Sequence, residues 1–256
     1  MNMDEVGSVE VNRNEWTNER VSTGLEKLDT LLSGGLPRNS ITLVSGTPGS
    51  GKSIVCYHYI WWGLQNNEKC LYLASDERIN SVLKQASELG FDFQQYVDNG
   101  QLKLWYLDID KPSMQREIAS EVKNGGYTRV VLDSLTPVSE LPVWVSDIHE
   151  VIPSESGEEF KKYPPGSTPA TRLHVRRIFS ILNQNHCTSL VTSEVPEGTR
   201  TLSRDTISEF LADGILLMDL DTTMDRRKIT IRKMRATKHT LKPQDITITS
   251  GGIKFL

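Results

Sequence analysis

The chain has 256 residues, which suits one large α/β domain or two small ones. Its formal net charge of −4 argues against a protein that coats nucleic acid over its whole surface, although it leaves room for a local basic patch. No apolar run approaches membrane-spanning length and the N-terminus is too polar for a signal peptide, so we expect a soluble, cytoplasmic protein with no membrane partner.

The chain begins with a polar stretch, residues 1–19, which we expect to be a flexible tail that Trp16 anchors at its end. Residues 20–256 then form one expected domain. Its first helix is predicted by leucines on one helical face and ends at Gly34 and Gly35. These leucines are Leu25, Leu28, Leu31 and Leu32.

Residues 46–53 match the pattern G-x-x-x-x-G-K-[ST] of a phosphate-binding loop. An apolar strand, residues 41–45, precedes the loop, and apolar residues at helical spacing predict a helix from about Gly51. Glycines let the backbone approach a polyphosphate, and a helix N-terminus favours negative charge. We expect Lys52 to contact the β- and γ-phosphates of a nucleotide and Ser53 to bind Mg²⁺. The expected nucleotide contacts are Gly46, Thr47, Pro48, Gly49, Ser50, Gly51, Lys52, Ser53 and Ile54.

A second buried strand, residues 70–74, is followed by Ser75, Asp76 and Glu77. Carboxylates at the C-terminal end of a parallel strand lie where open α/β sheets bind ligands, and one of them would polarise the water that attacks the nucleotide. The alternative is that Ser75 or Asp76 caps the next helix, residues 78–89. The residues alone leave both interpretations open.

The next predicted elements are a strand at residues 102–107, a helix at 112–123 and a strand at 129–133. The last strand ends in Asp133. Because this strand lies downstream of a phosphate-binding loop, we expect Asp133 to hold Mg²⁺ directly or through water. Cys56, Cys70 and Cys187 fit neither a disulfide framework nor a metal site, so we expect buried thiols.

Residues 136–168 contain five prolines and are expected to form a long irregular loop, in which Trp144 and Tyr163 contact a partner or cover the core. A helix is predicted at residues 169–185. Its arginines either meet a nucleic acid or a neighbouring subunit, or form a solvated face. They are Arg172, Arg176 and Arg177.

A strand at residues 188–193 ends in Ser193 and is followed by Glu194, and we expect these two residues to sense the γ-phosphate. Only strands are predicted after residue 214, which indicates a parallel sheet extended by antiparallel strands. These strands span residues 214–218, 228–234, 245–248 and 252–255.

Lys233 and Arg235 are two positions apart on a predicted strand, so their side chains should point the same way. A Lys and Arg pair at a sheet edge can reach a phosphate on an adjacent subunit, as an arginine finger does. The alternative is a charged edge strand that resists aggregation. The residues do not decide between these two roles.

The chain resembles the KaiC-like group of RecA-fold ATPases, which are related to archaeal RadA paralogs. The matching segments lie in order from Arg20 to Leu256. They are RVSTGLEKLDTLLSGGLP, GTPGSGKS, Asp76-Glu77, VVLDS, VTSE, LADGILLM, KMRATKH and ITSGGIKF.

The resemblance implies a RecA-type P-loop fold: a mostly parallel, twisted sheet flanked by helices, with antiparallel strands at its C-terminal end. It implies ATP and Mg²⁺ as cofactors and Asp76 and Glu77 as the water-activating carboxylates. It also implies that Lys233, Arg235 and His239 contact nucleotide bound to the next subunit. The protein would then form a homo-oligomer, either a hexameric ring or a filament, in at least one functional state.

The single phosphate-binding loop indicates a single-domain relative of the two-domain clock protein, and clock function is not implied. We expect a slow ATPase that acts as a regulatory module through nucleotide-dependent assembly and binding of a protein partner. The alternative is a recombination mediator in DNA repair that binds single-stranded DNA through cationic loops, for which Arg200 and Arg204 are further candidates. A third hypothesis is a nucleotide switch that does not hydrolyse ATP.

Overall fold

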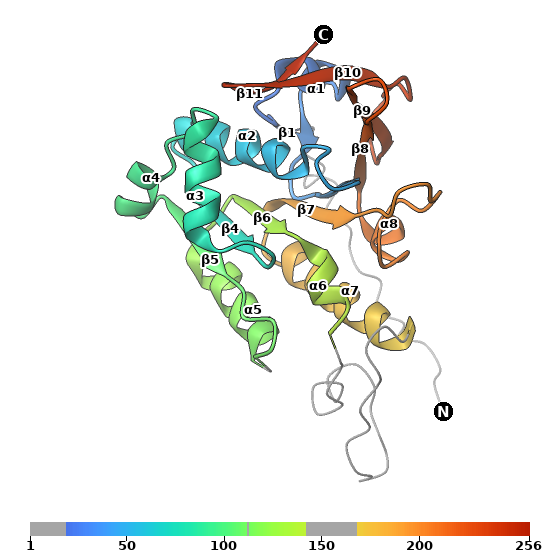
Figure 1. Cartoon of the computed structure of the whole chain (residues 1–256). Helices are drawn as coiled ribbons and strands as arrows, with labels where there is room; N and C mark the ends of the chain where they lie inside the picture. The colour runs from blue at the N-terminus through green and yellow to red at the C-terminus, as the bar shows by residue number, and fades with distance from the viewer. Residues whose placement is uncertain (1–18, 112, 142–167) are drawn as a thin grey trace, which may run out of the picture.

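A computed structural model of the chain describes residues 19–111, 113–141 and 168–256 (Figure 1). Trp16 and most of the tail expected at residues 1–19 lie outside the described residues, as do Trp144, Tyr163 and most of the segment 136–168. In the part of the chain that the structure describes, no helix is long and apolar enough to cross a membrane.

The described residues form a nine-stranded sheet with the strand order β11-β10-β9-β8-β3-β7-β6-β4-β5, and a separate pair, β1 and β2. The strands are β1 (Arg20–Val21), β2 (Leu36–Pro37), β3 (Ile41–Gly46), β4 (Cys70–Ala74), β5 (Leu102–Tyr106), β6 (Arg129–Asp133), β7 (Thr188–Glu194), β8 (Gly214–Asp221), β9 (Arg226–Met234), β10 (Gln244–Thr249) and β11 (Gly252–Phe255). From β8 to β5 all neighbouring strands are parallel, and from β8 to β11 they are antiparallel. The expected parallel sheet with C-terminal antiparallel strands is therefore confirmed.

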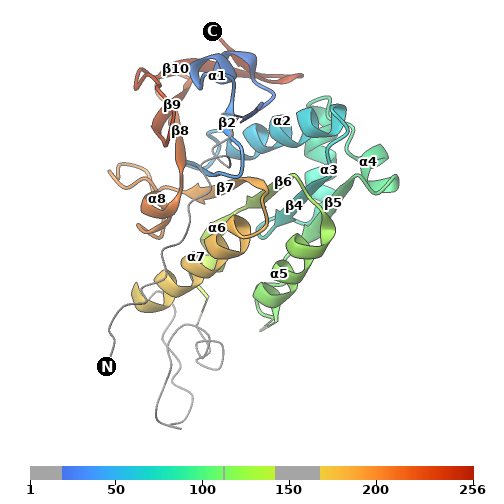
Figure 2. The same ribbon diagram turned by 180° about the vertical axis from the view of Figure 1, so that it is seen from behind.

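Helices cover both faces of the parallel strands (Figures 1 and 2). Their bounds are α1 (Glu26–Leu31), α2 (Lys52–Gln65), α3 (Ile79–Glu88), α4 (Gln94–Asp98), α5 (Met114–Gly125), α6 (Leu135–Ser139), α7 (Thr168–Asn183) and α8 (Ser208–Leu211). One face carries α2 and α3, and the opposite face carries α5, α6 and α7.

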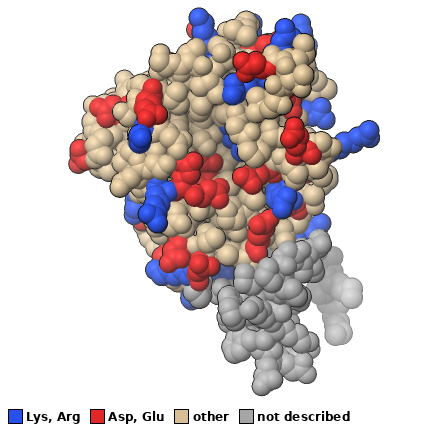
Figure 3. Space-filling model, viewed as in Figure 1, with Lys and Arg blue, Asp and Glu red and all other residues tan. Residues whose placement is uncertain are grey.

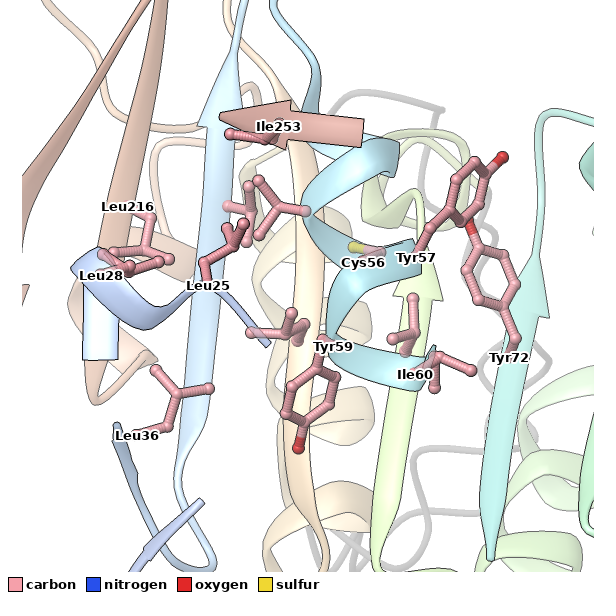
Figure 4. Close-up of a cluster of buried hydrophobic side chains, with 14 of the residues drawn as sticks. Leu25, Leu28, Leu36, Cys56, Tyr57, Tyr59, Ile60, Tyr72, Leu216 and Ile253 are labelled. Carbon is pink, nitrogen blue, oxygen red and sulfur yellow. The ribbon is translucent and has the colours of Figure 1, made fainter. Parts of the chain in front are cut away.

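The buried strands alternate between two cores because successive side chains point to opposite faces. In β3, for example, Leu43 packs toward α7 and its neighbour Val44 toward α2. The core under α2 is rich in aromatic rings, and the rings of Tyr57 and Tyr72 lie 6.0 Å apart between α2 and β4 (Figure 4). All three cysteines are free and buried, as expected.

Two expectations need correction. The prediction of an irregular segment from residue 136 is wrong at its start, because residues 135–139 form α6. Pro137 fits this helix because it lies in the first turn, where no amide donor is needed. Neither Ser75 nor Asp76 caps a helix. The following helix, α3, begins at Ile79 after Arg78, and no side chain caps its N-terminus.

Candidate functional site

The phosphate-binding loop connects β3 to α2, which begins at Lys52. Gly49 and Gly51 have φ angles of 75° and 103°, in the left-handed region that favours glycine. A side chain at Gly46 would place its Cβ 2.2 Å from the carbonyl oxygen of Met218, so this position also requires glycine. The amide of Ile54 is already bonded to the carbonyl of Gly51. The positive φ angles and this hydrogen bond therefore give the loop a tight curve.

Lys52 reaches back over this loop. Its Nζ donates hydrogen bonds to the carbonyl oxygens of Gly46 and Thr47, each at 3.0 Å. Burial lowers the pKa of Lys52, while Glu194 and Asp133 oppose that shift because their negative charges favour the ammonium form. The loop thus encloses a half-buried cation that faces carboxylates from two neighbouring strand ends.

Asp133 ends β6, and the strands on either side of it hold its carboxylate in place. The hydroxyl of Tyr72 in β4 donates to Oδ2 and the hydroxyl of Thr192 in β7 donates to Oδ1, each at 2.5 Å. Sequence reasoning missed both hydroxyls. The only signal for them was a hydroxyl-bearing residue within each buried strand. That signal does not identify a partner of Asp133 unless the neighbours of β6 in the sheet are known.

Asp76 and Glu77 follow β4, and each carboxylate accepts a hydrogen bond from a different element. Asp76 Oδ2 accepts a hydrogen bond at 2.6 Å from the hydroxyl of Ser134, which is the residue after Asp133. Glu77 Oε2 accepts one from Nε2 of Gln85 in α3 at 2.5 Å. The two candidate water-activating groups are therefore bonded to different elements. In Figure 3 acidic side chains gather near the middle of the visible face, where β4, β6 and β7 end.

Ser193 and Glu194 end β7 beside the loop, where Glu194 pairs with Gly46 in the sheet. The Ser193 hydroxyl accepts a hydrogen bond from the amide of Arg204 at 3.1 Å, and the Glu194 amide donates one to the Thr136 hydroxyl. The two expected sensor residues thus connect the loop to α6 and to the segment before α8.

The donor set at this edge of the sheet fits Mg²⁺. Ser53 offers a hydroxyl at the start of α2, and Asp133 offers a carboxylate held by two hydroxyls. Mg²⁺ prefers oxygen ligands and commonly takes only one or two from protein, with phosphates and water supplying the rest. These two side chains are the ones that would hold the ion.

Lys233 and Arg235 point the same way, as expected, and meet α8. Lys233 Nζ donates to the carbonyl of Ala212 at 2.6 Å, and Arg235 forms an ion pair with Asp213 at 2.9 Å. Both side chains also donate to the carbonyl of Phe210. His239 is partly exposed, with Nδ1 3.3 Å from the carbonyl oxygen of Thr240. Within one chain, the hydrogen bonds of the Lys and Arg pair are therefore made with the end of α8 and Asp213.

A groove of about 500 Å³ lies beside the phosphate-binding loop. Residues 195–202 form one wall, and β8 and β9 contribute Leu217, Asp219 and Arg232. Arg200 adds a second guanidinium group. Because Gly46 and Thr47 also line it, the groove shares a border with the loop.

Comparisons with known proteins agree over most of the chain. A family model described as "ATPase: KaiC" matches residues 21–144 and 166–256. A UPF0273 protein of Pyrococcus furiosus is 29% identical over 243 residues, covering 91% of this chain and 92% of that protein. A UPF0273 protein of Methanopyrus kandleri is 30% identical over 246 residues, covering 92% of this chain and 91% of that protein.

Two further matches carry the KaiC name. The circadian clock oscillator protein KaiC 1 of Synechocystis is 26% identical over 240 residues, which cover 93% of this chain and 44% of that protein. The crystal structure of a KaiC-like protein from Pyrococcus horikoshii superposes with a TM-score of 0.75 at 26% identity, covering 93% of this chain and 99% of that one.

Proposed function

The chain belongs to the KaiC family of ATPases, and we propose that it binds ATP with Mg²⁺ and hydrolyses the ATP slowly. The observation that carries this proposal is the position of Lys52, whose half-buried ammonium group lies within the loop and faces Glu194 and Asp133. A cation held in this way can exchange its two carbonyl partners for phosphate oxygens, which form stronger, charge-assisted hydrogen bonds.

In this proposal each nearby residue has one task. Main-chain amides of the loop, among them those of Gly49, Gly51 and Ser53, bind the phosphates together with Lys52, while Ser53 and Asp133 would hold Mg²⁺, which supplies positive charge to the phosphates when bound. Asp76 or Glu77 accepts a hydrogen bond from the attacking water, which raises the nucleophilicity of that water. Ser193 and Glu194 respond to the presence of the γ-phosphate.

We propose that a second copy of the chain completes the site. Lys233, Arg235 and His239 of one copy would contact nucleotide held by the loop of the next, and so would stabilise charge that develops on the transferred phosphoryl group. The position of Lys233 and Arg235 beside the end of α8 supports this, because the Arg235 side chain is exposed and the Lys233 side chain is partly exposed. Hydrolysis would then depend on assembly into a ring or filament.

The experiment is ATP retention and phosphate release by the wild type and by Lys52→Ala, with Lys123→Ala as a control at the end of α5. We expect Lys52→Ala to retain at least about tenfold less ATP, because it loses charge-assisted hydrogen bonds to phosphate. Lys123→Ala should behave as the wild type. Undiminished retention by Lys52→Ala would overturn the proposal, and retention without any phosphate release would favour a non-hydrolysing nucleotide switch.

We propose that such assembly serves a regulatory role, in which nucleotide-bound oligomers dock a protein partner. Native mass measured with and without ATP and Mg²⁺ tests the first step of this role. Larger particles that appear only with nucleotide are the expected result. An equal mass with and without ATP and Mg²⁺ would show that nucleotide does not drive assembly. That result would contradict the regulatory proposal.

The alternative proposal, a mediator of DNA repair that binds single-stranded DNA, is favoured by the groove beside the loop. Arg200 and Arg232 line this groove, and guanidinium groups bind phosphates and stack on bases. DNA binding of this kind would weaken steeply as salt rises and would be reduced in Arg200→Ala. No binding of a single-stranded oligonucleotide at low salt, with or without ATP, would eliminate this alternative.

A further inference from the structure

The side-chain amide of Gln85 contacts the carboxylate of Glu77, one of the two candidate water-activating groups. Nε2 of Gln85 donates to Glu77 Oε2 at 2.5 Å and also to the hydroxyl of Ser81 at 3.2 Å. An amide NH₂ group has two hydrogens, so one donor can serve both acceptors. Gln85 therefore links Glu77 to the surface of α3.

This contact follows from the position of α3. Ser81 and Gln85 are four residues apart and share one face of the helix, while Glu77 lies one further helical step toward the N-terminus, just before the helix begins at Ile79. Val82 and Ala86 of the same helix are buried in the core and fix its orientation against the sheet. Ser81 and Gln85 therefore lie on a face of α3 other than the one that Val82 and Ala86 bury, and Glu77 lies beside them at the start of the helix.

The carboxylates that act on Lys52 come from other positions. The negative charges of Glu194, Asp133 and Asp76 favour the charged form of Lys52 and so raise its pKa against the effect of burial. Asp76 and Glu77 are both exposed, but their carboxylates have different partners. Asp76 accepts a hydrogen bond from Ser134, the residue after Asp133, whereas Glu77 is bonded to Gln85 in α3.

We infer that Gln85 is a positioning residue that holds Glu77 against α3, so that the Glu77 carboxylate is not free to bind the attacking water. Glu77 then takes part in hydrolysis only in molecules in which this hydrogen bond is broken. The inference rests on the proposed ATPase function. The hydrogen bond between Gln85 and Glu77 would lower the rate of ATP turnover by keeping Glu77 from the reaction. Asp76, which is bonded to the residue after Asp133 and not to α3, would not be subject to this restraint.

Two substitutions of Gln85 should change turnover in opposite directions. Gln85→Ala removes the donor and should raise kcat about three- to tenfold, since an exposed hydrogen bond of ordinary strength shifts an equilibrium by that order. Gln85→Arg replaces it with a cation that pairs more strongly with Glu77 and should lower kcat by a similar factor. KM for ATP should stay unchanged in both, because the loop and Lys52 are not altered.

Gln184 offers a matched control, since it is an exposed glutamine that donates to the hydroxyl of Ser180 four residues earlier, just after the end of α7. Gln184→Ala and Gln184→Arg should leave kcat unchanged. Each Gln85 variant is also combined with Glu77→Gln. If Gln85 acts through Glu77, the residual turnover of Glu77→Gln should be the same with Gln85, Ala or Arg at position 85.

The inference is supported by opposite changes in kcat that disappear in the Glu77→Gln background. It is overturned if both Gln85 variants change kcat in the same direction or not at all, if their effects persist with Glu77→Gln, or if Glu77→Gln itself has wild-type turnover. A wild type that releases no phosphate from ATP overturns the proposed function, and the inference falls with it.

Discussion

At the scale of single residues, the carboxylate of Asp133 is the most constrained group of the site. Hydroxyl donors from β4 and β7 bond its two oxygens, and each oxygen keeps further lone pairs for other partners. Donors of this kind orient a metal-binding carboxylate and are often as important as the ligand itself. Tyr72 and Thr192 are therefore part of the proposed Mg²⁺ site, although neither would contact the ion.

Tyr72→Phe removes one of these donors and leaves Asp133 Oδ2 without that partner. We predict that the Mg²⁺ concentration for half-maximal ATP turnover rises about tenfold, the usual order for loss of an outer hydrogen bond at a metal site. A Mg²⁺ titration of phosphate release measures this. Tyr106→Phe, an exposed tyrosine at the end of β5, is the control, and equal Mg²⁺ requirements for Tyr72→Phe and wild type would contradict the prediction.

His58 in α2 predicts a pH-dependent stability. Its Nε2 accepts a hydrogen bond from the amide of Ile253 at 2.9 Å, and burial lowers the pKa of His58 from 6.5 to about 4. Because the folded protein favours neutral His58, this stabilisation is complete above pH 6.5 and is lost as the pH falls toward 4. Over that range the loss should be on the order of 3 kcal/mol in the free energy of unfolding.

Urea unfolding of wild type and His58→Gln at pH 7 and pH 4.5 tests this account. Glutamine can still accept a hydrogen bond but does not titrate. The wild type should therefore lose more stability than the variant between the two pH values. Equal losses would show that His58 does not cause the pH dependence.

At the scale of elements, hydrogen bonds join the short helix α8 both to the segment after β7 and to Lys233 and Arg235 at the end of β9. Glu209 Oε2 accepts hydrogen bonds from the amide of Leu202 at 2.8 Å and from the hydroxyl of Ser203 at 3.2 Å. The other end of α8 is bonded by Lys233. A conformational change in residues 195–202, which line the groove, can therefore be transmitted through α8 to Lys233 and Arg235, the cations that are proposed to act on a neighbouring copy.

Glu209→Ala removes the acceptor that holds this segment. We predict that the amide of Leu202 exchanges its hydrogen about tenfold faster, because a hydrogen bond to a charged acceptor contributes about 1.5 kcal/mol or more. Hydrogen–deuterium exchange resolved to residues 198–206 measures the effect. Glu197→Ala, an exposed position in the same segment, should leave the rate unchanged, and an unaltered Leu202 rate in Glu209→Ala would count against the connection.

The long elements could be predicted from the sequence because their patterns reflect local physics. The buried strands are apolar runs, and α3 and α5 each bury one face. The short helices α4, α6 and α8 could not be predicted in this way, because helices of four or five residues depend on tertiary contacts rather than on periodicity.

The candidate site likewise contains residues that local sequence patterns predict and residues whose role depends on tertiary contacts. The loop and Asp133 follow from a motif and a strand end, whereas the partners of Asp133 depend on which strands are neighbours. The helix-cap interpretation of Asp76 was wrong because α3 begins three residues later, which leaves Asp76 free to bond Ser134. Gln85 carries no sequence signal, since exposed glutamines are common on helices.

At the scale of the whole molecule, the expected RecA-type P-loop fold is confirmed by the family match and by the structural neighbour. The candidate site is divided over this fold. The loop, Asp133 and Asp76 lie at the C-terminal ends of parallel strands, while Lys233 lies near the end of the antiparallel strand β9, Arg235 follows that strand, and both bond to the end of α8. This division is what a site shared between two copies requires.

A mixing experiment tests this shared site most directly. Lys52→Ala lacks the cation of its own loop but keeps Lys233 and Arg235, whereas Arg235→Ala keeps the loop but lacks a cation for its neighbour. We predict that each variant alone releases phosphate from ATP at well below the wild-type rate. In a mixture, some interfaces join an intact loop to an intact Arg235, so turnover should exceed the average of the two separate proteins. Turnover equal to that average, in mixtures that native mass shows to be co-assembled, would contradict a site built from two copies.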